Sequence, residues 1–227
     1  MTKVKFLKFS DHITQVAFYA LAAAVTFSIA LTEIAVATII FLWIIKRVLA
    51  HDVSLPVKRL SLILLLFVLW NLLSFINTIY IYESARGLLK VLKYFLLFLA
   101  TVDYFKEKNS KKYFLLFFIV VGFLISLNGI FQHFTGTDLI RHRTIDPLDS
   151  LHRIQSSFVH SNDFGAYLVV VISILMSLFF STLRRFKQRL LLLLVSLPMI
   201  ECLVATGSKS VHALLKIAAA PADMKIF

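Results

Sequence analysis

The chain has 227 residues, of which 59% are hydrophobic and 16% are charged. Soluble domains are about 45–50% apolar and about 25% charged, so this composition excludes an ordinary water-soluble globule. The net charge of +12 would favour nucleic acid as the partner of a soluble protein. In a membrane protein such an excess instead reflects basic cytoplasmic loops, so we expect membrane lipids and no nucleic acid as partners. The one cysteine, Cys202, allows no internal disulfide.

Apolar runs predict the helices of the chain. A helix that crosses a bilayer needs about 20 mostly apolar residues. We therefore predict an all-α fold, a polytopic transmembrane helix bundle of about seven spans, with a hairpin turn at Glu33 between the first two spans. In chain order the predicted spans are Ile13–Leu31, Ile34–Ile45, Leu60–Ile76, Leu88–Phe105, Tyr113–Phe131, Phe164–Leu183 and Leu190–Ala205.

The basic residues predict the orientation of these spans. Fifteen of the 24 Lys and Arg residues lie before the first span or in every second connection after it. Because short cytoplasmic loops are rich in Lys and Arg, the N-terminus is predicted to be cytoplasmic. The long polar loop at about 132–163 then faces outward. The start of the chain also resembles a secretory signal, but removing it would break this alternation.

The outward side carries a candidate anion site. Arg153 lies in the long loop, and Ser161, Asn162 or Asp163 can cap the helix that follows it. A capped helix is one reading of these residues. In the other, the helix N-terminus and the arginine together bind a phosphate, although Asp163 would repel it. Lys209, after the last span, lies on the same side and can add a further cation.

A basic stripe marks the fourth predicted span. At 100° per residue, Arg86, Lys90 and Lys93 fall within about 60° of one another on a helix. Ionisable residues inside a span are functional candidates. Lys93 lies about 10 Å along the axis from Arg86 at 1.5 Å per residue, so it is the hardest of the three to hydrate. The stripe suits a lipid-linked phosphate at the outer leaflet.

The histidines of the long loop do not have the spacing of a metal site. Eight to ten residues separate His133, His142, His152 and His160, whereas metal sites favour tight spacings. The sequence also has no P-loop and no dinucleotide fingerprint. We therefore predict no metal and no cofactor.

Three segments of the sequence resemble the O-antigen ligase and O-antigen polymerase family. Gly129-Ile-Phe-Gln132 with Thr135-Gly136 is similar to the family pattern G-I-x-Q. Arg153 to Tyr167 is similar to R-x-x-G-x-F-x-x-P-N-x-x-A-x-x-L, and Thr206-Gly207-Ser208-Lys209 to T-x-S-R-G. With the hydropathy profile, the resemblance covers most of residues 13–210.

The resemblance implies a multi-pass glycosyltransferase of the bacterial inner membrane that acts in lipopolysaccharide biosynthesis. Such enzymes take a glycan from undecaprenyl diphosphate on the periplasmic side. Ligases transfer the glycan to lipid A–core, and polymerases extend a glycan chain. Arg153 matches an outward arginine that holds the diphosphate, and Lys209 replaces an arginine without keeping its planar fork. The predicted diphosphate-binding residues are Arg153, Lys93, Lys209, Asn162, Lys90 and Arg86.

The end of the chain departs from the family pattern. Family members continue with a large periplasmic loop that carries a general-base histidine. Residues 1–210 are therefore expected to be the N-terminal transmembrane part of such an enzyme, and 211–227 an aberrant tail left by a truncation or frameshift. No catalytic residue is predicted, and whether the chain is an active enzyme stays open. A polymerase, a small transporter component and a catalytically dead remnant are the alternatives.

Overall fold

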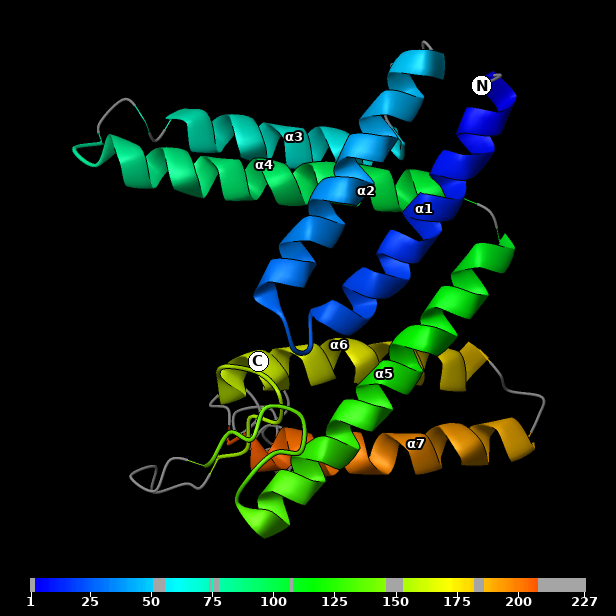
Figure 1. The fold of residues 1–227 in the computed structure, drawn as a ribbon, viewed down its shortest axis with the longest axis vertical. Helices are drawn as coiled ribbons and strands as arrows, with labels where there is room; N and C mark the ends of the chain where they lie inside the picture. Colours follow the sequence, from blue (N-terminus) through cyan, green and yellow to red (C-terminus); the bar gives the residue numbers. More distant parts are fainter. Residues whose placement is uncertain are drawn as a thin grey trace, which may run out of the picture. The chain divides into compact units, whose positions relative to one another are not determined.

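The computed structural model describes residues 3–50, 56–73, 75, 78–106, 108–145, 153–181 and 186–207. Over this part of the chain the protein is all-helical, as the sequence predicts, apart from one isolated bridge between Thr137 and Thr144. The helices are α1 (Lys3–Ala24), α2 (Ile29–Ala50), α3 (Lys58–Leu73), α4 (Ile81–Tyr104), α5 (Lys108–Thr135), α6 (Ser161–Ser181) and α7 (Phe186–Ala205) (Figure 1).

The chain divides into two compact units. The first unit comprises Met1–Leu21 and Ala30–Phe114, and the second comprises Ala22–Ile29 and Leu115–Phe227. The turn between α1 and α2 therefore belongs to the second unit, although most of both helices belongs to the first.

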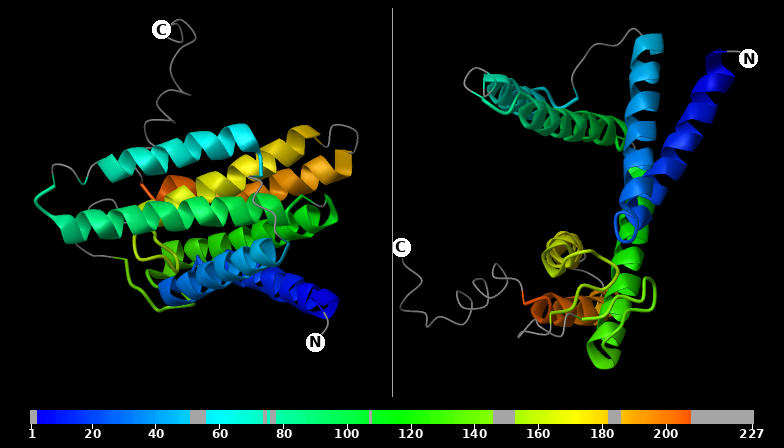
Figure 2. Two further views of the ribbon diagram at one scale, coloured as in Figure 1. Left: turned by 90° about the horizontal axis from the view of Figure 1, so that it is seen from above. Right: turned by 60° about the vertical axis from the view of Figure 1, so that its left-hand side comes forward.

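Aromatic side chains form the core of the first unit. Phe18 of α1 packs against Tyr104 and Phe105 at the end of α4, with ring centroids 4.9 and 5.0 Å apart. The ring centroid of Phe114, early in α5, lies 4.8 Å from that of Phe105. In the same unit α3 and α4 lie side by side as an antiparallel pair (Figures 1 and 2).

Two polar contacts join α2 to α4 in the first unit. The Lys93 ammonium donates to both carboxylate oxygens of Glu33, at 2.7 and 2.8 Å. Ten residues further along each helix, the Trp43 indole and the Arg47 guanidinium both donate to the Asp103 carboxylate at 3.1 Å. The contacts advance equally along both helices, but α2 and α4 cross steeply and are not parallel (Figures 1 and 2).

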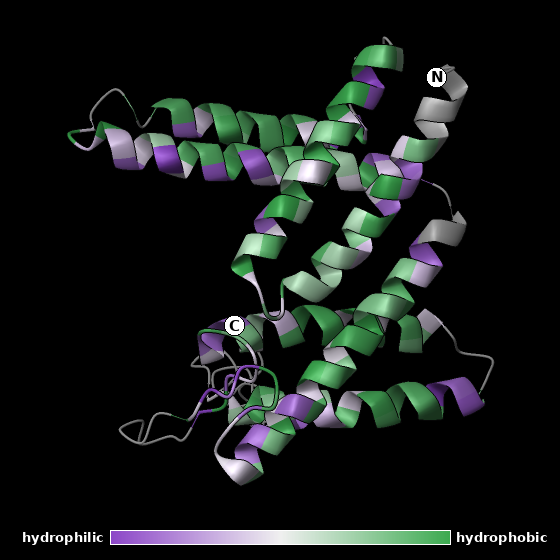
Figure 3. Ribbon diagram, viewed as in Figure 1, coloured by the Kyte–Doolittle hydropathy of each residue, from purple (hydrophilic) through white to green (hydrophobic). Residues whose placement is uncertain are grey.

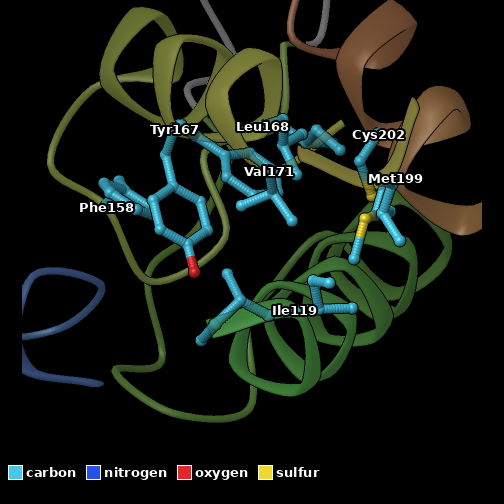
Figure 4. Packing of buried hydrophobic residues seen from close by; sticks show 11 residues of the cluster. Ile119, Phe158, Tyr167, Leu168, Val171, Met199 and Cys202 are labelled. Atoms are coloured by element: carbon cyan, nitrogen blue, oxygen red, sulfur yellow. The ribbon is translucent and has the colours of Figure 1, made fainter. Parts of the chain in front are cut away.

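Glycines let α5 approach its neighbours closely in the second unit. A Cβ atom at Gly122 would lie 2.9 Å from Val171 of α6, and one at Gly129 would lie 3.0 Å from the Cys202 sulfur of α7. Val171 and Cys202 are fully buried, together with Leu168 and Met199 (Figure 4). The helices α6 and α7 lie side by side, so α5, α6 and α7 share one apolar core.

Among the helices that the structure describes, four are long and apolar enough to cross a membrane: α2, α5 from Lys111 onward, α6 and α7. At most 33% of each apolar stretch is buried inside the protein, so most of this apolar surface would face water outside a membrane. The chain is therefore a helical membrane protein. The described part of α3 has 16 residues, a length of about 24 Å at 1.5 Å per residue. Hydrophilic residues recur along α4 (Figure 3).

The predicted turn at Glu33 is wrong. The chain turns at residues 25–28, where the N–H groups of Thr26, Phe27 and Ser28 donate to the carbonyls of Ala23 and Ala24. Glu33 lies inside α2, because glutamate is a good helix former and its carboxylate pairs with Lys93.

The long polar loop predicted at about 132–163 is a few residues shorter at each end in the structure. Helix α5 continues to Thr135, and α6 begins at Ser161. Gly136 follows α5 with a φ of +78°, a left-handed conformation that glycine adopts without strain at a helix end. The loop is therefore shorter than 132–163, and both Gln132 and Asn162 lie in helices.

Candidate functional site

Gln132, near the end of α5, is fully buried and holds the backbone of two loop segments. Its side-chain carbonyl accepts hydrogen bonds from the N–H groups of Gln155 at 3.0 Å and Ser156 at 2.7 Å. Its side-chain amide donates to the Arg143 carbonyl at 3.1 Å. One side chain thus satisfies three backbone groups. A glutamate carboxylate of the same size has no hydrogen for the third bond.

Asn128, one helical turn before Gln132, makes a second set of contacts with the same segments. Its amide donates to the Ser156 hydroxyl at 2.9 Å, and its side-chain carbonyl accepts from the Leu139 N–H at 2.8 Å. The Ser156 hydroxyl in turn donates to the Ile125 carbonyl at 3.0 Å. We call Asn128 and Gln132 together the α5 amide clamp.

The clamp holds Ser156 in an uncommon backbone conformation. Ser156 is buried and has a φ of +50°, in the left-handed region that non-glycine residues seldom occupy. Such a conformation costs on the order of 1–3 kcal/mol and persists only where surrounding contacts enforce it. The hydrogen bonds to Gln132, Asn128 and Ile125 supply that enforcement.

Asp138 organises the other loop segment. Its carboxylate, almost fully buried, accepts hydrogen bonds from the N–H groups of Ile140, Arg141 and Arg143 at 3.1, 2.8 and 2.6 Å. This is a turn built on an aspartate side chain. The Arg143 guanidinium then donates to the Phe158 carbonyl at 2.8 Å, so it ties this segment to the one that carries Arg153.

The three segments that resemble the family motifs meet in the second unit. Gln132 of the first motif binds the backbone of the second motif at Gln155 and Ser156. The Ile154 N–H, beside Arg153, donates at 3.2 Å to the carbonyl of Ala205, the residue directly before the third motif-like segment. Sequence positions about 20 to 70 residues apart thus form one connected polar end of α5, α6 and α7.

Two of the predicted site residues belong to this polar end. Arg153 is half-buried, and it precedes Ile154, which is fully buried. Asn162 is exposed in the first turn of α6. The three expected capping residues, Ser161, Asn162 and Asp163, form the first turn of α6 itself. The N–H groups of Asp163 and Phe164 donate to the His160 carbonyl at 3.2 Å.

The predicted basic stripe belongs to the first unit. Arg86, Lys90 and Lys93 all lie on α4, and Lys93 forms the ion pair with Glu33 described above. That ion pair gives Lys93 a structural partner that the sequence did not indicate. The structure therefore places the stripe and Arg153 in different units. Lys209 and the tail at 211–227 lie outside the described residues.

The histidines and acids form no metal site in the part of the chain that the structure describes, where no three His, Cys, Asp or Glu side chains gather. His133, His142 and His160 are exposed, and His152 lies outside that part.

Sequence reasoning missed two residues that build the site, Asn128 and Asp138. The available signal for Asn128 was an amide residue in an apolar run, four residues before another amide at Gln132. Residues with this spacing share a helix face. Asp138 gave no such signal, because its partners are backbone N–H groups of its own loop.

The described loop segments of the polar end carry an excess of positive charge. Arg141, Arg143 and Arg153 bring guanidinium groups to the loop segments, and the Asp138 carboxylate is occupied by backbone donors. Asp163 is exposed in the first turn of α6 and opposes this charge in part. Guanidinium groups can bind phosphate oxygens through paired hydrogen bonds.

Fold and site together define a helical membrane protein with an ordered, arginine-bearing polar end. Comparison with protein-family models, with curated proteins and with solved structures finds no match to the chain.

Proposed function

We propose that this protein is an O-antigen ligase-like or polymerase-like protein of the bacterial inner membrane. Its polar end around Arg153 binds an undecaprenyl-diphosphate-linked glycan on the periplasmic side. The glycan acceptor is lipid A–core or, for a polymerase, a growing glycan chain. Asn162 and Lys209 are the further residues that we assign to the diphosphate at this end of the protein.

One observation carries the proposal: the α5 amide clamp joins the first motif-like segment to the second. The family pattern has glycine at the position of Ser156, and the φ of Ser156 is +50°, the conformation that favours glycine. A conformation held at this cost next to Arg153 supports a role for the loop beyond connecting two helices.

The contacts of the first unit support the proposed topology of seven spans with a cytoplasmic N-terminus. The ion pair of Asp11 with Lys46, at 2.8 Å, fits two antiparallel helices joined by the turn at 25–28. In that topology Arg153 lies on the periplasmic side.

The chemistry assigned to Arg153 is stabilisation of the leaving group. In the proposed transfer an acceptor hydroxyl oxygen attacks the anomeric carbon of the sugar, and the bond from that carbon to the diphosphate oxygen breaks. A base takes the hydroxyl proton, and the diphosphate leaves with the bonding electrons. A guanidinium fixed beside the diphosphate stabilises the charge that develops on it.

The test is binding of undecaprenyl diphosphate to the purified protein in nanodiscs, with Arg153→Gln compared with wild type. We expect Arg153→Gln to weaken binding at least tenfold, about 1.4 kcal/mol, because paired charge-assisted hydrogen bonds are lost. Lys112→Gln is the matched control, because Lys112 is an exposed cation near the start of α5, at the opposite end of that helix from the α5 amide clamp. Equal binding by wild type and Arg153→Gln would overturn the assignment.

A further inference from the structure

Of the three cations in the basic stripe of α4, Lys93 is paired with a carboxylate in the described structure. Lys93 donates to both Glu33 oxygens, and its ammonium lies 4.9 Å from the centroid of the Tyr94 ring. Its side chain is 25% exposed, so α2 and Tyr94 cover most of it. Lys93 is therefore satisfied within the protein.

Arg86 and Lys90 differ from Lys93 in this respect. Both are exposed, and neither has a hydrogen-bond or ion-pair partner among the described residues. They are four residues apart, so their side chains project from the same face of α4 on successive turns. Glu83 is the nearest carboxylate along the helix, but in the described structure it pairs with neither cation. The charges of Arg86 and Lys90 are therefore available to an anion from outside the protein.

Exposed aromatic and aliphatic side chains lie beside these cations at the start of α4. Tyr80 and Tyr82 are 74% and 76% exposed, and Ile79 and Ile81 are 90% and 66% exposed. Tyrosine is enriched where a membrane protein passes from lipid hydrocarbon to the headgroups, because its ring is apolar and its hydroxyl is polar. Arg and Lys at this depth extend their charged ends toward the phosphates. This combination matches the headgroup layer of a lipid leaflet.

We propose that Arg86 and Lys90, flanked by Tyr80 and Tyr82, bind the phosphate of an anionic glycerophospholipid. We call these four residues the α4 headgroup surface. The phosphate accepts hydrogen bonds from the guanidinium and the ammonium, and the acyl chains cover the exposed aliphatic side chains of the helix. A lipid-linked diphosphate offers the same phosphate chemistry, so the experiment compares the two lipids.

Native mass spectrometry of the full chain in mild detergent measures lipid binding directly. Phosphatidylglycerol, phosphatidylcholine and undecaprenyl diphosphate are titrated separately against wild type and the double variant Arg86→Gln/Lys90→Gln. The matched control is Lys111→Gln/Lys112→Gln, which removes two exposed cations from the start of α5.

We expect the α4 double variant to bind phosphatidylglycerol at least tenfold more weakly, with phosphatidylcholine binding unchanged and the control variant like wild type. Unchanged phosphatidylglycerol binding by the α4 variant would overturn the proposal, as would an equal loss in the control. If the α4 variant lost binding of undecaprenyl diphosphate alone, the proposal would also be overturned, because Arg86 and Lys90 would then bind that lipid and not phosphatidylglycerol. Loss of all three lipids, with an earlier unfolding transition, would show a structural role and reject the proposal. Arg153→Gln leaves phosphatidylglycerol binding intact, so this result is independent of the test of the proposed function.

Discussion

At the scale of single residues, buried and half-buried polar side chains decide the local structure of this protein. Gln132 satisfies three backbone groups, and Asp103 accepts from Trp43, Arg47 and Lys106. Each hydrogen bond that such a side chain makes adds only modest net stability. The larger effect is that its partners are not buried without a hydrogen bond, which would be costly. Removing such a side chain is therefore costly.

Gln132 offers the sharpest stability test. Replacing it with leucine keeps the side-chain volume similar but leaves the N–H groups of Gln155 and Ser156 and the Arg143 carbonyl without their partner. We expect Gln132→Leu to lower the free energy of unfolding by about 3 kcal/mol, since each unsatisfied buried group costs about 1–3 kcal/mol and the loop relaxes in part. Denaturant titration in detergent micelles measures this change.

The neighbouring His133 provides the control for Gln132. Its side chain is exposed, so we expect His133→Ala to change the free energy of unfolding by less than about 0.5 kcal/mol. Limited trypsin digestion gives an independent readout, because Gln132→Leu should expose the backbone after Arg153. A Gln132→Leu protein as stable and as resistant to trypsin as His133→Ala would contradict the clamp.

At the scale of helices, close packing of α5 depends on the missing side chain at Gly122. A Cβ there would meet Val171, whose branched side chain has few alternative rotamers. We expect Gly122→Ala to lower the free energy of unfolding by about 1–3 kcal/mol, the usual cost of overpacking a core. The measurement is again denaturant titration in micelles.

Gly87 on α4 is the matched control for Gly122. It is exposed, and a Cβ at this residue would meet no atom within 4 Å. Because alanine is the better helix former, Gly87→Ala should stabilise the protein by about 0.5–1 kcal/mol. The two identical substitutions should thus have opposite signs, and the same sign at both would show that α5 does not pack at Gly122 as described.

The helices also show what a sequence can and cannot predict. Hydrophobic runs place one helix at each predicted span, because an apolar run of this length must be hydrogen-bonded internally. The helix ends differ from the predicted spans, since Lys, Arg and Glu outside the apolar runs are good helix formers and extend α2 to Ala50 and start α5 at Lys108. The turn at residues 25–28 has no glycine or proline to mark it.

The candidate site could be predicted from the sequence in part. Arg153 and Gln132 lie in segments that resemble family motifs, so the sequence indicated both. Asn128 and Asp138 act through backbone groups, whose positions depend on the folded loop and leave no mark in residue spacing. The partner of Lys93 was hidden because Glu33 lies 60 residues away and was expected in a turn.

At the scale of the whole molecule, the number of membrane crossings can be tested by cysteine labelling. In a Cys202→Ser background, single cysteines replace the exposed residues Lys58, Glu83, Lys111 and Arg141. With seven spans and a cytoplasmic N-terminus, a membrane-impermeant maleimide should label positions 83 and 141 in intact spheroplasts. Positions 58 and 111 should react only after permeabilisation.

The labelling result at position 83 distinguishes two topologies. If α3 and α4 cross the membrane, positions 58 and 83 lie on opposite sides. If both helices remain on one side, positions 58 and 83 react together, and the seven-span topology is rejected. Cys202 is fully buried, and serine keeps a donor for its hydrogen bond to the Ser126 carbonyl, so the background substitution should leave the fold intact.

The second unit includes a hydrogen bond from the Ser157 hydroxyl to the Thr26 carbonyl, at 2.6 Å, which joins residues 131 positions apart. At about 5–20 residues per second, a ribosome needs on the order of 7–26 s to synthesise the chain between them. The turn at residues 25–28 is synthesised first, and its hydrogen-bond partner Ser157 is synthesised only at the end of this interval. During biosynthesis the first hairpin is therefore an early client of the insertion machinery, and a substitution that removes the Ser157 hydroxyl would leave the Thr26 carbonyl without this partner.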